Sequence, residues 1–262
     1  MNKPKLSEIL SHVSPIGYSE AISICRQKLD SQEKLSVFTP NSEMLHRALI
    51  NTEAKELLFS AGLLFPDGIG AYMSMKLLRA SPAEKTAGIE LGERLIRLAA
   101  LKGYKIYFLG AKRGAAKKAA ERLSTKHTGL DVCGYHHGYF EKEGKENDLV
   151  IDKINRSGAD ILFVCFGFPA QEEWIRKNLS RLDSVKLAVG LGGSLDVWSG
   201  NVKRAPSFVS EMGLEWLWRI AKDPKRIPRV KNLALFLYIT LKETLFNRKK
   251  RGKCYEIDNF SK

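Results

Sequence analysis

The sequence lacks the patterns of secreted, disulfide-bonded or zinc-binding proteins. Its four cysteines lie far apart, no pair has CxxC spacing, and no histidine lies at zinc-finger distance from them. This usage is typical of reduced thiols in a cytosolic protein. The first residues lack the apolar core of a signal peptide. The longest apolar runs, 161–168 and 233–241, fall short of the roughly 20 residues that span a bilayer. We therefore expect a cytoplasmic protein that does not cross a membrane.

Several ligand-binding motifs are also missing. The chain has no GxGxxG of dinucleotide-binding proteins and no P-loop ending in GK[ST]. It has no Asp-x-Asp pair, which metal-dependent nucleotide-sugar enzymes often present. His136 and His137 have no Cys or His partners nearby in the sequence, so we interpret them as loop residues. We therefore expect no bound metal ion and no cofactor.

Positive charge is concentrated at one end of the chain. Residues 203–262 contain 15 Lys and Arg against 6 Asp and Glu, which is +9 of the net charge of +14. The same segment contains Trp216, Trp218 and the apolar run 233–241. Basic residues mixed with tryptophan and aliphatic side chains suit an anionic membrane face or a lipid-linked phosphate. If the positive charge were spread evenly along the chain, it would instead favour nucleic acid as the binding partner.

The body of the chain alternates strand-like and helix-like patterns. Strands are predicted at 35–39, 105–109, 130–134, 160–166 and 186–189, and helices at 42–51, 70–79, 90–102, 114–124, 148–155 and 171–179. Strands separated by helices indicate βαβ units and a mostly parallel sheet with helices on both faces. After residue 201 the strand signals stop and basic helical segments follow. We predict an α/β catalytic core over 1–200 and a basic helical appendage over 201–262.

Two polar loops in the first part of the chain are candidates for the strand-end loops where open parallel sheets bind their ligands. Thr39 and Asn41 lie at the end of the strand at 35–39. An Asn there commonly caps the next helix, and both side chains would also offer hydrogen bonds to a sugar. Asp67 lies in a Pro-Asp-Gly sequence that is common in turns. It also follows an apolar stretch, so its carboxylate is suited to act as a general base.

Two glycine-containing loops later in the chain are further candidates. Gly110 lies between a strand and a helix in FLGAKRG, where a helix N-terminus suits a diphosphate, although a tight βα turn explains the motif equally well. Gln171 begins the helix after the strand at 160–166. Gly192, in GLGGS, would let a ligand approach the backbone closely, although glycine turns often serve only packing.

Six stretches taken together resemble the WecG/TagA/CpsF glycosyltransferases (glycosyltransferase family 26), in order and over about residues 10–240. The stretches are TPNSEMLHRAL, FPDGIGAYMSMKLL, KIYFLGAKRGAAKKAAERL, DILFVCFGFPAQEEWI, VGLGGSLDVWSGNVKRAP and GLEWLWRIAKDPKRIPR. The resemblance implies a Rossmann-like α/β core with a C-terminal appendage that contacts the membrane. It implies inverting, metal-independent transfer of an N-acetylmannosamine-type sugar from a UDP-sugar to N-acetylglucosamine on a polyprenyl diphosphate. It also implies that the protein self-associates in solution. The product would be used in the biosynthesis of teichoic acid or exopolysaccharide.

The resemblance assigns roles to individual residues. Asp67 matches the proposed catalytic base, Thr39 and Asn41 match residues of the sugar pocket, and Gln171 matches an amide that contacts substrate. Appendage arginines thought to hold the nucleotide diphosphate are matched by Arg219, Arg226 and Arg229.

This chain departs from the family at one substrate-binding position. Many members have Arg where this chain has Lys85, and Lys lacks the fork geometry of Arg for an anion. The appendage arginines raise a second question. Arg219 and Arg226 would share a face of one helix, but Pro224 and Pro228 are expected to break it, so a turn must bring the three arginines together.

Other interpretations remain open. The donor is UDP-N-acetylmannosamine, its uronic acid or UDP-glucose, with enterobacterial common antigen among the candidate products. A basic nucleic-acid-binding protein is an alternative of another class, but RRM, KH and helix-turn-helix signatures are missing, so we expect no nucleic acid partner. A nicotinamide-dependent oxidoreductase would need GxGxxG and an acidic residue about 20 positions later, and neither is present.

Overall fold

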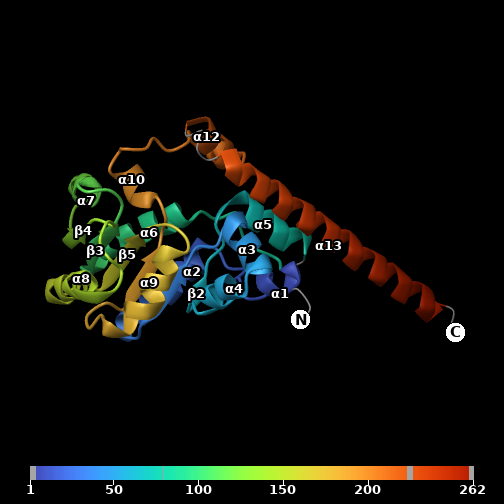
Figure 1. Ribbon diagram of the computed structural model, residues 1–262, viewed down its shortest axis with the longest axis horizontal. Helices are drawn as coiled ribbons and strands as arrows, with labels where there is room; N and C mark the ends of the chain where they lie inside the picture. Colours follow the sequence, from blue (N-terminus) through green and yellow to red (C-terminus); the bar gives the residue numbers. More distant parts are fainter. Residues whose placement is uncertain (1–3, 79, 223–226, 260–262) are drawn as a thin grey trace.

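A six-stranded parallel sheet forms the centre of the protein in a computed structural model that describes residues 4–78, 80–222 and 227–259 (Figure 1). The strands lie in the order β2-β1-β6-β5-β3-β4. They are β1 (Leu35–Phe38), β2 (Leu63–Leu64), β3 (Lys105–Gly110), β4 (Asp131–His136), β5 (Ile161–Cys165) and β6 (Leu187–Gly190). The predicted parallel α/β fold is confirmed.

Helices cover both faces of this sheet. The chain contains α1 (Leu6–Leu10), α2 (Tyr18–Asp30), α3 (Ser42–Ile50), α4 (Thr52–Phe59), α5 (Gly68–Leu77), α6 (Gly88–Lys102), α7 (Ala115–Lys126), α8 (Gly144–Ser157), α9 (Ala170–Asn178), the 3-10 turn η1 (Leu179–Arg181), α10 (Ser194–Trp198), α11 (Ser207–Glu211), α12 (Glu215–Lys222) and α13 (Ile227–Asn259). Alternate residues of each strand enter opposite clusters, as the period of two requires. Tyr107 and Leu109 pack with α8 and α9, while Ile106 and Phe108 pack with α2, α6 and α7.

Several elements differ from the sequence prediction. The two-residue strand β2 and the helices α1, α2 and α4 were not predicted. Strand β2 is too short to show a period, and α1 and α4 are helices of only five and eight residues. His136 is the last residue of β4, so its assignment to a loop is wrong, whereas His137 follows the strand. Arg79, at the end of one predicted helix, lies outside the described residues.

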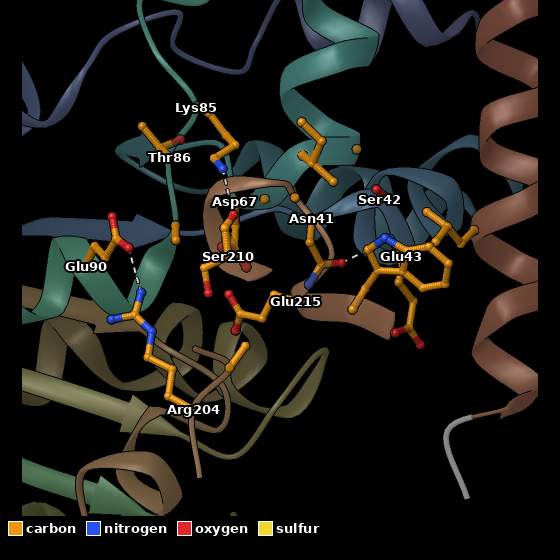
Figure 2. A pocket seen from close by; sticks show the side chains of 18 of the residues that line it. Asn41, Ser42, Glu43, Asp67, Lys85, Thr86, Glu90, Arg204, Ser210 and Glu215 are labelled. Atoms are coloured by element: carbon orange, nitrogen blue, oxygen red, sulfur yellow. Dashed lines mark hydrogen bonds and ion pairs between the residues drawn. The ribbon is translucent and has the colours of Figure 1, made fainter. Parts of the chain in front are cut away.

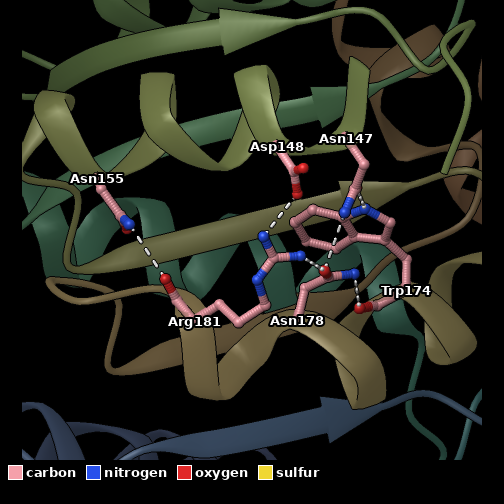
Figure 3. Close-up of polar contacts among 6 residues, drawn as sticks. All are labelled: Asn147, Asp148, Asn155, Trp174, Asn178 and Arg181. Carbon is pink, nitrogen blue, oxygen red and sulfur yellow. Dashed lines mark hydrogen bonds and ion pairs between the residues drawn. The ribbon is translucent and has the colours of Figure 1, made fainter. Parts of the chain in front are cut away.

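A buried polar network holds α9 against α8 (Figure 3). The Trp174 indole N–H donates to Asn147 Oδ1 at 2.6 Å, and Asn147 Nδ2 donates to Asn178 Oδ1 at 3.0 Å. Asn178 Nδ2 returns a hydrogen bond to the Trp174 carbonyl at 2.9 Å. Every donor of this network has a partner, which is the condition under which buried polar groups stabilise a fold. The network therefore fixes α9, whose first turn reaches the carboxyl ends of the strands.

The last helix packs its inner stripe into the core. Phe236 of α13 is completely buried in the same cluster as residues of α1, α3 and α5, and Thr240 and Thr244 continue the stripe one and two turns later. Figure 1 shows α13 crossing over α3 and α5 and projecting beyond the body. Among the described residues from 207 onward, helices joined by short turns are the only regular elements, as predicted, while the boundary near 200 stays a prediction.

Helix α13 also completes the first helix of the chain. The Glu243 carboxylate accepts hydrogen bonds from the backbone N–H groups of Leu6 at 2.8 Å and Ser7 at 3.0 Å, and from the Ser7 hydroxyl. These N–H groups begin α1 and have no partner within the helix. A side chain more than 230 positions away in the sequence thus acts as the cap of α1.

Replacement of Glu243 by alanine should destabilise the protein. The loss of this cap leaves two backbone donors without their acceptor, and we expect the free energy of unfolding to fall by about 1–2 kcal/mol. Urea unfolding measures the change. The exposed neighbour Lys242→Ala is the control and should leave stability within about 0.5 kcal/mol of wild type. Equal stabilities of the two variants would contradict the capping role.

Candidate active site

A cavity of about 600 Å³ lies between the carboxyl ends of β1 and β2 and the helices after residue 204. Figure 2 shows the side chains that line it. The loops after β1 and β2 supply Asn41 and Asp67, and the segment before α6 supplies Lys85. The opposite wall comes from Arg204, α12 and the start of α13. The cavity is therefore shared by the α/β core and the appendage.

Asp67 is held in this cavity by backbone contacts. Its N–H donates to the Pro40 carbonyl at 3.0 Å, which joins the loop after β2 to the loop after β1. Its carboxylate does not cap α5, although its backbone occupies the capping position. Instead, Oδ1 accepts a hydrogen bond from the Gly88 N–H at 2.9 Å, at the first turn of α6. The N-terminus of a helix favours a negative charge, so α6 orients and stabilises this carboxylate.

Asn41 caps a helix and lines the cavity at the same time. Its Oδ1 accepts from the N–H groups of Glu43 at 3.0 Å and Met44 at 3.2 Å, at the start of α3. Because Oδ1 serves the helix, a contact from Asn41 to a ligand would come from Nδ2. Helix capping and hydrogen bonding to a sugar, the two roles considered for Asn41 from the sequence, are therefore compatible with this geometry.

Two polar contacts fasten the appendage across the cavity. Lys85 Nζ donates to the Ser210 carbonyl of α11 at 2.7 Å. Arg204 Nη2 contacts Glu90 Oε1 at 2.6 Å. Figure 2 shows both pairs on the cavity wall. The predicted substrate-binding residue Lys85 thus contacts the appendage backbone directly.

Glu90 is a structural carboxylate rather than a free base. Its Oε2 accepts a hydrogen bond from the Tyr18 hydroxyl at 2.7 Å, and that hydroxyl accepts from the Ala87 N–H at 2.7 Å. Burial would raise the pKa of Glu90, but the hydrogen bonds from Tyr18 and Arg204 outweigh it and hold the pKa below its ordinary value. Burial also raises the pKa of Tyr18. Glu90 therefore stays ionised and fully engaged near neutral pH.

Thr39 and Gln171 lie at the carboxyl ends of the strands but do not line the cavity. The Thr39 hydroxyl donates to the Gly190 carbonyl at 2.9 Å, and the side chain is buried. Gln171 Oε1 accepts from the N–H groups of Gly167 at 3.2 Å and Gly192 at 2.9 Å. In this structure both side chains join neighbouring loops.

The two predicted glycines have different surroundings. A Cβ at Gly110 would collide with the Cys165 carbonyl, so this position needs glycine for the close approach of β3 and β5. Gly192 has a φ of 53°, and no atom lies within 4 Å of the place where its Cβ would be. Gly192 therefore leaves open space beside the backbone, as a ligand-binding loop requires.

The appendage arginines are only partly described. Arg226 lies outside the described residues, as do the side chains of Arg219 and Arg229. The backbone of Arg219 belongs to α12, which ends at Lys222, and that of Arg229 belongs to α13, which begins at Ile227. Pro224, where a helix break was expected, lies outside the described residues, and Pro228 is the second residue of α13, so no break occurs there. Ile220 and Val230, their neighbours in sequence, line the cavity.

Sequence reasoning missed several residues of the cavity. Tyr18 lies in the N-terminal region that gave no prediction, and Glu90 was identified only as a helix start. Arg204 was part of the quoted KRAP stretch but received no role. Trp216 and Leu233 were assigned to a membrane-facing surface, and both line the cavity. Arg204 and Trp216 lie in stretches that carry the resemblance, whereas Tyr18 and Glu90 lie outside all six stretches and gave no such signal.

Glu172 is an unusual buried acid next to this region. Its side chain is completely buried, and Oε1 accepts a hydrogen bond from Gln171 Nε2 at 2.8 Å. Burial raises the pKa of Glu172 to about 7, against the opposing effect of the Gln171 hydrogen bond. A carboxyl group in these surroundings is largely protonated at slightly acidic pH.

No three His, Cys, Asp or Glu side chains in the described ranges come together in a way that would hold a metal ion. No helix within the same ranges combines the length and apolar character needed to cross a bilayer.

The sequence pattern of the Glycosyl transferase WecG/TagA/CpsF family matches residues 8–250, and the chain belongs to this family. It is a glycosyltransferase of the hexosyltransferase class. Its similarity extends to proteins named N-acetylglucosaminyldiphosphoundecaprenol N-acetyl-beta-D-mannosaminyltransferase. That of Bacillus spizizenii is 36% identical over 82% of this chain and 81% of its own length. Those of Bacillus subtilis and Staphylococcus aureus are each 32% identical, over 82% and 79% of this chain and 82% and 80% of their own lengths.

Replacement of Glu172 by glutamine should change how stability depends on pH. The carboxyl pKa is about 7 in the folded state and 4.5 in the reference state. The folded protein therefore loses stability as pH rises from about 4.5 to about 7. Glutamine cannot ionise, so Glu172→Gln should exceed wild type by about 3 kcal/mol at pH 8, at 1.36 kcal/mol per pKa unit. The difference should shrink toward zero near pH 4.5.

Urea unfolding from pH 4.5 to pH 8 measures this difference. The exposed neighbour Glu173→Gln is the matched control and should follow wild type at every pH. A stability difference for Glu172→Gln that stays constant over this range would contradict a buried titrating carboxyl group.

Proposed function

We propose that this enzyme transfers N-acetylmannosamine from a UDP-sugar to N-acetylglucosamine carried on undecaprenyl diphosphate. The names of the relatives specify this sugar and this acceptor for those proteins. The observation that carries the proposal for this chain is the position of Asp67. Its carboxylate lies in a cavity whose other wall is the basic appendage, and α6 holds it in place.

The proposed reaction is a single displacement with inversion. A hydroxyl group of the acceptor sugar attacks the anomeric carbon from the face opposite UDP. The new carbon–oxygen bond forms as the bond to UDP breaks, and UDP leaves with the bonding electron pair. Asp67 takes the proton of the attacking hydroxyl, a step that typically contributes a factor of about 10²–10⁴. In this mechanism no metal ion stabilises the leaving group.

The charges on the cavity wall support a division of labour between core and appendage. The described lining contains four carboxylates, from Glu43, Asp67, Glu90 and Glu215, and two cationic side chains, from Lys85 and Arg204. Lys85 and Arg204 already contact Ser210 and Glu90. A departing diphosphate needs further positive charge. Arg219, Arg226 and Arg229 are the residues that we propose to supply it.

The apolar part of the cavity suits the lipid of the acceptor. Ile69, Trp216, Ile220, Val230 and Leu233 line it where α5 faces α12 and α13. Asp67 and Lys85 lie in the polar part of the same cavity. A lipid-linked sugar likewise has a polar end, the sugar and its diphosphate, and an apolar end, the hydrocarbon chain. We therefore place its sugar near Asp67 and its first isoprene units between these helices.

The outer face of α13 suits an anionic membrane surface. Tyr238, Leu241 and Leu245 are each more than half exposed and lie at helical spacing along one face. The exposed Lys231 and Lys242 flank them. Apolar side chains beside lysines are typical of helices that lie in the membrane interface. We propose that the enzyme works as a peripheral protein on the cytoplasmic face of the bacterial membrane, where the acceptor is anchored.

The three candidate donor sugars can be distinguished by experiment. Assays with UDP-N-acetylmannosamine, its uronic acid and UDP-glucose, each with a GlcNAc-diphospholipid and with EDTA present, identify the donor and test metal independence. A nucleic-acid-binding protein would instead show salt-sensitive DNA or RNA binding and no affinity for UDP.

Replacement of Asp67 by asparagine should abolish transfer while leaving the fold intact. The amide oxygen still accepts the Gly88 hydrogen bond, but the side chain can no longer take a proton. We expect kcat to fall by about 10²-fold or more, with UDP affinity within about twofold of wild type by calorimetry. The exposed Asp152→Asn is the control for charge. Near wild-type turnover in Asp67→Asn would rule out this residue as the base.

Acidic substitutions on the outer face of α13 should remove membrane binding. The double variant Leu241→Glu and Leu245→Glu replaces two exposed side chains, so the fold should be retained. Sedimentation with vesicles that contain anionic lipid should show at least a tenfold loss of binding. The conservative pair Leu241→Met and Leu245→Met should bind like wild type. Undiminished binding of the acidic variant would show that another surface contacts the membrane.

A further inference from the structure

The loops that follow β1, β5 and β6 are joined by buried side chains. Gln171 is at the centre, because its Oε1 accepts from Gly167 N–H in the loop after β5 and from Gly192 N–H in the loop after β6. Thr39 links the end of β1 to the Gly190 carbonyl at 2.9 Å. These contacts set the spacing of three loops at the edge where parallel sheets bind their ligands.

The orientation of the Gln171 amide depends on Glu172. The two glycine N–H groups need an acceptor, so Oε1 must face them and Nε2 must face the other way. Glu172 Oε1 lies there at 2.8 Å and accepts from Nε2. A reversed amide would place its NH₂ group against two N–H donors. Glu172 therefore holds the one orientation in which Gln171 joins the two loops.

Glu172 has no other evident use in the fold. Its side chain is completely buried in the first turn of α9, and within the described chain its Oε2 has no hydrogen-bond partner. An apolar side chain of similar size would remove an unpaired buried polar atom, and such a replacement is often neutral or stabilising. The presence of an acid at this position thus points to a role other than stability.

A line of contacts runs from Glu172 toward Asp67. A Cβ added to Gly190 would lie 2.8 Å from Gln171 Nε2 and 3.4 Å from Glu172 Oε1, so β6 packs directly on this pair. Thr39 is hydrogen-bonded to the Gly190 carbonyl, and a Cβ added to Gly88 would lie only 3.0 Å from the Thr39 side chain. Gly88 in turn donates its N–H to Asp67. The loops around Gln171 are therefore connected to Asp67 through the packing of Gly190, Thr39 and Gly88.

We propose that Glu172 is a positioning residue, which holds the Gln171 amide and thereby the glycine loops after β5 and β6 in the arrangement that binds the nucleotide sugar. This inference rests on the proposed function for the identity of the ligand. Glu172 itself contacts neither substrate. Because burial raises the pKa of Glu172, the group accepts the hydrogen bond without a full negative charge near the ligand.

Glu172→Leu tests the role, because leucine suits a buried site and cannot accept the hydrogen bond of Gln171. We expect the KM for the UDP-sugar and the Kd for UDP to rise about tenfold, with the KM for the lipid acceptor within twofold. Glu172→Gln keeps an acceptor for Nε2 and should stay within twofold of wild type in each quantity. The effect of Glu172→Leu should disappear in a Gln171→Ala background, because the residue acts through Gln171.

Amide hydrogen exchange gives a readout that needs no activity. The amides of Gly167 and Gly192 should exchange at least fivefold faster in Glu172→Leu than in Glu172→Gln. Unchanged exchange and unchanged UDP affinity in Glu172→Leu would overturn the inference, and so would equal damage from leucine and glutamine. The proposed function fails separately, if wild-type enzyme neither binds UDP nor modifies the lipid acceptor. In that case the exchange rates still decide whether Glu172 positions the loops.

Discussion

The cavity depends on the burial of one side of α13. Phe236 enters the main core cluster, and the stripe that it begins holds the appendage against α3 and α5. Without that contact, Asp67 would lie in an open groove between two strand-end loops. The core provides the carboxylate of Asp67, and the appendage provides the facing wall of the cavity. Hydrophobic burial thus assembles a polar site from segments that are far apart in the sequence.

The electrostatics of the site follow from this arrangement. Asp67 and Glu90 are close in the same wall but have different environments. The Glu90 carboxylate is hydrogen-bonded to Tyr18 and paired with Arg204, so it stays ionised. Asp67 is instead oriented by the N-terminus of α6 and lines the cavity. Two carboxylates with different partners take different roles, one in the structure and one in the proposed chemistry.

The sequence predicted the parallel sheet, which the structure confirms, whereas the roles assigned to the site residues stay predictions. The apolar run at 160–166 favoured a buried parallel strand, and β5 lies within it. The roles of Thr39 and Gln171 were harder to predict, because a polar residue after a strand serves equally well to join loops or to bind a ligand. Arg204 and Tyr18 reach the cavity only through long-range packing, which leaves no periodic signal.

The contact between Glu243 and α1 has a consequence for biosynthesis. The first helix of the chain receives its cap from the last one. During translation the N-terminal end leaves the ribosome long before Glu243 has been made, so α1 cannot reach its final state while the chain is growing. The α/β core can form earlier, but α13 and α1 complete each other only after Glu243 has left the ribosome. A chain interrupted before α13 would therefore lack both the cap of α1 and the wall that α13 gives to the cavity.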